Sequence, residues 1–223
     1  MPRNTFESQL TALKKQLLDL GTDVGGTIIN GVQALETRDR ALAQATIDHD
    51  EEINRIRYEI EENAYELIAT QQPLASDLRE IISILLIAIE LERIADHSKN
   101  LAEIVIFMGN EPLLKPLIDI PRMAALCEEL LGQVMDAFAR RDAALGRAVC
   151  QRDDEVDQLY QQVFRELLSF LVDDPRVVRR ALNLLFAAHN LERIGDRITN
   201  IGERVIYAAT GKLEELNVQK PAG

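Results

Sequence analysis

Leu91-Glu92-Arg93-Ile94-Ala95-Asp96 returns 100 positions later as Leu191-Glu192-Arg193-Ile194-Gly195-Asp196. The match continues at the same spacing, so that 9 of the 17 residue pairs from 91/191 to 107/207 are identical. Upstream, a second match at a spacing of 103 joins Arg38-Asp39 to Arg141-Asp142, and Asp50 to Asp153. Self-similarity of this length indicates one unit of roughly 100 residues used twice. We expect the two units to span residues 1–112 and 113–223.

Composition favours a helical protein that carries excess negative charge. Of the 223 residues 47% are hydrophobic, but only 4% are aromatic and none is Trp. Leu, Ile and Ala dominate, which favours helices over sheets. The formal charge of -12 argues against nucleic acid as a partner, and suits binding to cations or to basic protein surfaces. The longest apolar run, 81–89, is too short to span a bilayer. Cys127 and Cys150 have no metal-ligand spacing, so we expect free thiols in a soluble, cytoplasmic protein.

Periodicity and capping residues predict six helices, three in each unit. Asp39 and Asp142 are expected N-caps at equivalent places, and Asp174-Pro175 is a typical helix start. Three consecutive helices joined by short loops favour an up-down-up bundle. The sequence therefore predicts an all-α fold of two tandem, pseudo-symmetric three-helix bundles, with helices about 45 Å long. Four glycines in the first helix indicate either close packing against a neighbour or a break: Gly21, Gly25, Gly26 and Gly31.

A stripe of polar side chains runs along the third helix of each unit. At about 100° per residue, Glu92, Asp96, Asn100 and Glu103 lie on one narrow face, opposite the apolar face. The last helix repeats the stripe with Glu192, Asp196, Asn200 and Glu203.

The second helix of each unit brings further acidic residues to these stripes. Asp50 lies 23 residues before Pro73 and Asp96 lies 23 residues after it, so antiparallel helices place both at one height. The same count places Asp153 beside Asp196. One turn further it places Asn54 near Glu92, and Asp157 near Glu192.

Carboxylates gathered in this way repel one another, and a hard cation with oxygen ligands removes that cost. The candidate metal-ligating residues are Asp50, Glu92, Asp96, Asn100, Asp153, Asp157, Glu192, Asp196 and Asn200. The alternative is that each stripe is only the solvated side of a helix, or pairs with Arg93 and Arg193. Retention of the stripe in both units favours function, because residues between its members have changed. Because no catalytic constellation and no Glu-x-x-His pair of di-iron bundles is present, we expect no enzyme activity.

Two copies of Leu-Glu-Arg-Ile-(Ala/Gly)-Asp, each with Asn four residues on and each closing a three-helix unit, resemble the PhoU family. The resemblance implies a cytoplasmic protein that represses the phosphate-starvation response when phosphate is plentiful. It also implies contact with the ATPase of the phosphate ABC transporter and with a membrane sensor histidine kinase, and through them with the inner membrane. Some family members bind iron or zinc through the motif. By position, those ligands are Glu92, Asp96, Glu192 and Asp196. The first copy has Ala95 where the second has Gly195, and because both are small, this difference puts little of the resemblance in doubt.

We therefore expect a negative regulator of phosphate uptake that forms a homodimer and has no bound nucleic acid and no membrane span. Its expected cofactor is a di- or trivalent metal, with iron or zinc first and Mn, Mg or Ca also compatible. Two alternatives stay open, namely a metal-binding or metal-storage bundle and a metal-free acidic scaffold.

Overall fold

The computed structural model describes residues 3–216, which form helices and loops and contain no strand. The first half consists of α1 (Arg3–Thr37), α2 (Arg40–Gln71) and α3 (Ala75–Met108). The second half consists of α4 (Asp119–Arg140), α5 (Ala143–Gln151), α6 (Asp153–Asp173), the single turn η1 (Pro175–Val177) and α7 (Val178–Thr210). The all-α prediction is confirmed.

The turn between the first two helices of each half uses the same device twice. Arg38 and Arg141 both adopt left-handed backbone angles, with φ of 56° and 54°. The next residue then caps the following helix. The Asp39 carboxylate accepts from two backbone N–H groups at 2.9 and 3.0 Å, and Asp142 does the same at the same distances. The repeated Arg-Asp pair is therefore a repeated helix–helix junction, with both caps where the sequence predicts them.

The fifth predicted helix is interrupted at Arg152, which separates α5 from α6. The backbone N–H of Arg152 donates to Val149 O at 3.0 Å, a tighter turn than the α-helical one. Just before this point α5 lies very close to α7. The closeness is seen at Gly202 of α7, where an added Cβ would stand 2.4 Å from the Cys150 Sγ atom of α5. The equivalent of Gly202 in the first half is Ala102, and α2 there runs without a break. We attribute the interruption to this close approach.

Two of the glycines in α1 mark close packing, and α1 is continuous. A Cβ on Gly31 would stand 2.9 Å from the Ser98 carbonyl oxygen of α3. A Cβ on Gly21 would stand 2.9 Å from the Met135 side chain of α4. Gly26 has open space instead. The first of the two explanations that the sequence leaves open is therefore correct for Gly21 and Gly31.

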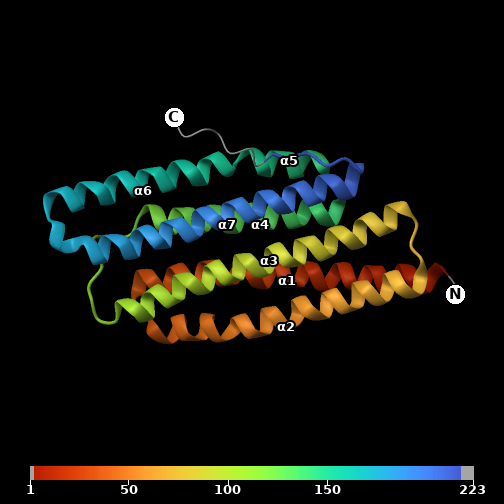
Figure 1. The fold of residues 1–223 in the computed structure, drawn as a ribbon, viewed down its shortest axis with the longest axis horizontal. Coiled ribbons are helices and arrows are strands. Elements are labelled where there is room, and N and C mark those ends of the chain that lie inside the picture. Colours follow the sequence, from red (N-terminus) through yellow and green to blue (C-terminus); the bar gives the residue numbers. More distant parts are fainter. Residues whose placement is uncertain (1–2, 217–223) are drawn as a thin grey trace.

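The two halves pack against each other along their length (Figure 1). The last helices of the two halves, α3 and α7, lie against each other, and α1 lies against α4. Helices α2 and α6 form the opposite outer edges of the molecule (Figure 1). Each acidic stripe therefore runs along a central helix, beside an outer helix.

A buried charge also links the halves. Glu80 of α3, which is 4% exposed, accepts from Lys14 of α1 at 3.2 Å and pairs with Arg141 at the end of α4. The Glu80 carboxylate therefore joins α1 and α3 of the first half to the end of α4 in the second.

Candidate functional site

Each outer helix brings a carboxylate beside the stripe of the neighbouring central helix. In the first half, burial raises the pKa of Asp96, and Asp50 raises it further. In the second half, burial raises the pKa of Asp153 to about 7, with further contributions from Asp157 and Asp196. These electrostatic contacts agree with the heights counted along the sequence.

The first acidic group consists of Asp50, Glu92 and Asp96. Asp50 is 5% exposed, and its Oδ2 atom accepts from Lys99 Nζ at 2.9 Å and from Asn54 Nδ2 at 3.2 Å. The bond to Asp50 raises the pKa of Lys99, so the ammonium is charged at neutral pH. The Asp50 Oδ1 atom is buried and has no hydrogen-bond partner. The Lys99 ammonium therefore already forms a hydrogen bond with Asp50, the most buried carboxylate of this group.

Glu92 completes the first acidic group and has cationic neighbours of its own. Burial raises its pKa, and Asp96 adds to the rise. Arg57 of α2 and Arg93 of α3 act in the opposite direction. The charge of the first group is therefore largely balanced by side chains of the same half.

The second acidic group consists of Asp153, Asp157, Glu192 and Asp196. Burial raises the pKa of Glu192 to about 7, with Asp196 as the next cause. The Glu192 Oε2 atom is buried without a hydrogen-bond partner and lies 3.3 Å from His189 Nδ1. Asp196 pairs with Arg193 at 2.7 Å. Every charged neighbour that contributes to the pKa of Asp153 is itself a carboxylate.

The difference between the groups lies at three pairs of equivalent positions. Where the first half has Lys99, the second has Thr199, which is 2% exposed. The other two pairs are Arg57 with Tyr160, and Asn54 with Asp157. At each pair the second half is more negative by one charge. The second acidic group therefore carries repulsion that the first has relieved.

The absence of a side chain at Gly195 allows Asp153 of the second acidic group to lie close to α7. A Cβ at Gly195 would stand 2.8 Å from Asp153 Oδ1, so the carboxylate lies directly against the backbone of α7. The first half has Ala95 at this position. An Ala at position 195 would therefore require the Asp153 carboxylate to move.

The stripe asparagines contact the other half of the molecule. Asn100 Nδ2 donates to Asn190 Oδ1 of α7 at 3.3 Å, and Asn200 Nδ2 donates to Glu90 Oε2 of α3 at 3.2 Å. His97 Nδ1 also reaches Asn190 Oδ1, at 3.0 Å. Since Asn190 and Glu90 are equivalent positions, the two amides make matching contacts across the packing of α3 on α7. Their placement gives them a role in joining the halves.

Both acidic groups offer oxygen donors of the kind that hard cations prefer. Within residues 3–216, no three His, Cys, Asp or Glu side chains are already gathered in a metal-holding arrangement. Side chains of either group would have to turn to coordinate an ion. Each group has one buried oxygen without a hydrogen-bond partner, Asp50 Oδ1 in the first and Glu192 Oε2 in the second. Each also has an internal cation, Lys99 on Asp50 and Arg193 on Asp196.

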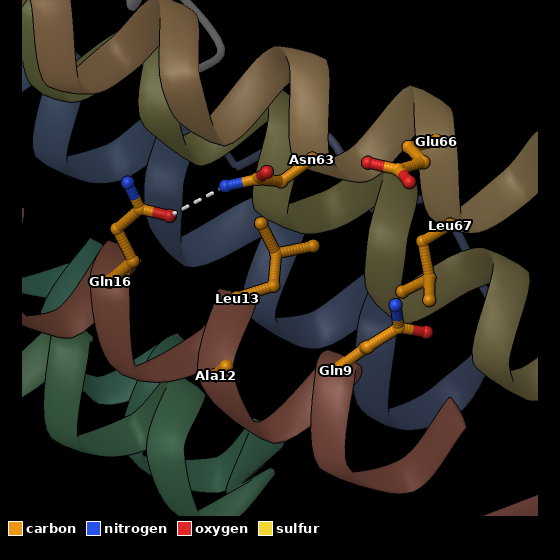
Figure 2. A pocket seen from close by; sticks show the side chains of 7 residues that line it. All are labelled: Gln9, Ala12, Leu13, Gln16, Asn63, Glu66 and Leu67. Atoms are coloured by element: carbon orange, nitrogen blue, oxygen red, sulfur yellow. Dashed lines mark hydrogen bonds between the residues drawn. The ribbon is translucent and has the colours of Figure 1, made fainter. Parts of the chain in front are cut away.

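A surface hollow elsewhere offers no comparable chemistry. It lies between α1 and α2, has a volume of about 190 Å³, and is lined mainly by amide and aliphatic side chains (Figure 2). Asn63 Nδ2 donates across it to Gln16 Oε1 at 3.2 Å. Small-molecule sites usually exceed this volume, and the lining has one carboxylate, Glu66. The acidic groups remain the stronger candidate.

The two cysteines and the polarity of the helices bear on two further kinds of site. Cys127 and Cys150 are free and buried, and burial raises the pKa of the Cys150 thiol to about 12. Both thiols therefore stay protonated, as inert core residues. Among the described helices, none has an apolar stretch that could cross a bilayer.

Comparisons with known proteins agree with the internal repeat. The family model described as PhoU domain matches twice, over residues 17–105 and 120–205. The phosphate-specific transport system accessory protein PhoU homolog of Caulobacter vibrioides is 37% identical over 218 residues, covering 97% of this chain and 94% of that protein. The homolog of the same name in Pseudomonas aeruginosa is 37% identical over 209 residues, covering 92% and 86%.

Solved structures give the same result. The crystal structure of PhoU from Pseudomonas aeruginosa matches with a TM-score of 0.88 and 36% identity, covering 93% of this chain and 100% of that one. The phosphate transport system regulatory protein PhoU from Streptococcus pneumoniae matches with a TM-score of 0.87 and 30% identity, covering 94% and 99%.

Proposed function

Because the chain belongs to the PhoU family, we propose that it is a negative regulator of the phosphate-starvation response and of high-affinity phosphate uptake. The observation that carries this is the double match of the family model, one match for each half and each containing one acidic motif. The relatives and solved structures are named as accessory or regulatory proteins of phosphate transport. An accessory role in the same process follows for this chain.

In this proposal the protein acts by contact with other proteins and not by catalysis. Its partners are the ATPase subunit of the phosphate transporter and the phosphate-sensing histidine kinase, which it bridges. Exposed apolar side chains support a contact function, because such rows usually bind other proteins. They recur at four-residue spacing on the outer surfaces of α6 and α7: Phe164, Leu168, Val172, Val178, Leu182 and Phe186. The expected homodimer stays a prediction.

The acidic groups supply the second part of the proposal. A cation held by carboxylates at the edge of α7 changes the local charge that a partner meets, without any change of fold. The burial and mutual repulsion of these carboxylates support this role. The alternatives are metal storage, in which the cation itself is the cargo, and a metal-free scaffold that uses its negative charge to bind basic surfaces.

Capture from cells grown with excess phosphate tests the proposal. The tagged chain is recovered, its partners are identified by mass spectrometry, and its metal content is measured in the same preparation. We expect both the transporter ATPase and the sensor kinase. Metal without either partner would favour storage, and both partners without metal would favour the scaffold. A matched pair of variants locates the contact: Leu168→Asp on α6 should lose a partner, while Tyr65→Asp at the equivalent exposed position of α2 should keep both.

A further inference from the structure

Six exposed apolar side chains, called here the α6–α7 row, lie along these two neighbouring helices. Their exposed fractions lie between 40% and 76%. Counted outward from Pro175, they stand at equal heights in three pairs, which lie three, seven and eleven residues from the turn: Val172 with Val178, Leu168 with Leu182, and Phe164 with Phe186. One turn beyond Phe164, the ring centroid of Tyr160 lies 6.2 Å from that of His189 on α7. This contact places the inner end of the row at the junction between α6 and α7.

The inner end of the row adjoins the second acidic group. His189 Nδ1 lies 3.3 Å from Glu192 Oε2. Burial raises the pKa of the Tyr160 hydroxyl, and the nearby Glu192 carboxylate adds to the rise. Asp157, which is exposed, lies one turn before Tyr160 on α6. The group has four carboxylates and one internal cation, Arg193, so the surface changes from apolar to negative at this end.

The equivalent surface of the first half has a different character. Glu61 and Tyr65 of α2 occupy the positions of Phe164 and Leu168. Glu61 pairs with Arg57 at 2.7 Å and accepts from the Tyr65 hydroxyl at 2.6 Å. Helix α2 therefore carries paired polar side chains where α6 is apolar. The α6–α7 row is a feature of the second half and not a consequence of the repeat.

We propose that the α6–α7 row binds one amphipathic helix of a partner protein, whose apolar face lies on the row and whose Lys or Arg side chains reach the second acidic group. This inference rests on the proposed contact function and specifies the chemistry of the partner. An apolar strip is the usual docking surface of an amphipathic helix, and charges at its end set orientation and specificity. Val172 and Asp157 are 15 residues apart, so a partner helix of about 22 Å covers the whole surface. An anionic membrane fits less well, because the carboxylates would repel its head groups.

Photo-crosslinking in cells grown with excess phosphate tests the proposal. A benzoylphenylalanine replaces Leu168, Phe186 or, as the matched control, Tyr65, and the crosslinked peptide is sequenced by mass spectrometry. We expect Leu168 and Phe186 to reach one segment, with apolar residues at three- and four-residue spacing and Lys or Arg at one end, and Tyr65 not to reach it. Crosslinks to lipid, to a second copy of this chain or to a segment without basic residues would overturn the proposal. The absence of any crosslink from Leu168 and Phe186 would also overturn it.

The captured segment is then made as a synthetic peptide, and its binding to the purified full-length chain is measured by fluorescence anisotropy. Leu168→Asp should weaken binding by about tenfold or more. Asp157→Asn should weaken it by about threefold and reduce its salt dependence. Tyr65→Asp should leave the affinity unchanged, and circular dichroism checks that every variant stays folded. Unchanged affinity in Leu168→Asp or in Asp157→Asn would contradict the proposed docking mode, while the regulatory function would still be decided by gene expression in a deletion strain.

Discussion

Neutralising Asp153 should stabilise the metal-free protein, although the residue belongs to a proposed functional site. Asp153→Asn keeps the size of the side chain and removes a charge that faces other carboxylates. A rise in pKa from 3.8 to about 7 corresponds to a ceiling of roughly 4 kcal/mol, at about 1.4 kcal/mol per unit. Asp153 is only partly buried, and solvent screening reduces this to about 1–2 kcal/mol.

The sign of the pH dependence follows from the raised pKa. The folded protein binds a proton at Asp153 more tightly than the unfolded chain does, so stability falls as pH rises between about 4 and 7. Above the folded pKa the destabilisation is complete and constant. The gain from Asp153→Asn should therefore be largest at pH 8 and about half as large at pH 5.5.

Urea unfolding followed by circular dichroism, with a chelator present, measures this difference. Asp50→Asn is the matched control and should have the opposite sign. It weakens the bond from Lys99 to a buried carboxylate and should cost about 1 kcal/mol or more. Equal destabilisation by both variants at pH 8 would contradict this prediction, because it would mean that the charge of Asp153 is as well compensated as that of Asp50.

Three further changes test the rest of the structure. Asp39→Ala and Asp142→Ala should each cost about 1 kcal/mol in urea unfolding, because each removes a cap with two hydrogen bonds; a loss in only one variant would contradict the repeated junction. Gly31→Ala should lower the free energy of unfolding by about 1–3 kcal/mol, because the added methyl group would clash with α3. Gly26→Ala should raise it by up to about 1 kcal/mol, because the methyl group would point into open space. Equal effects of the two variants would count against close packing at Gly31. If the second group binds zinc, adding zinc should raise the melting temperature of the unmodified chain but not that of Asp153→Asn, and a similar rise in both would place the ion elsewhere.

Much of the fold follows from the sequence because its signals are local or repeated. The Arg-Asp pairs predict both helix junctions, and the 100-residue spacing predicts the two sets of helices. The interruption at Arg152 was missed because it depends on how closely α5 approaches α7 at Gly202. That distance between helices has no signature along the chain.

The sequence predicts the acidic residues of both groups because the motif is repeated, but the direction and contacts of each side chain depend on how the helices pack. Counting residues from Pro73 and Pro175 gives heights along the helices and not their rotation. Asn100 and Asn200 therefore seemed equivalent to the acidic residues, although they contact the opposite half. The sequence also offers no indication that Lys99 pairs with Asp50, because the replacement of Lys99 by Thr199 in the second half is not by itself a sign of a contact.

We propose that this chain restrains phosphate uptake through its acidic groups. The most direct measurement is the expression of phosphate-scavenging genes, together with phosphate uptake, in a strain that lacks the chain and grows with abundant phosphate. Any paralogue is deleted as well. We expect high expression and high uptake in this strain. The unmodified chain should restore both to low values, whereas a chain with Asp153→Asn and Glu192→Gln, present at an equal protein level, should not. Normal expression and uptake in the deletion strain, or full restoration by the double variant, would contradict it.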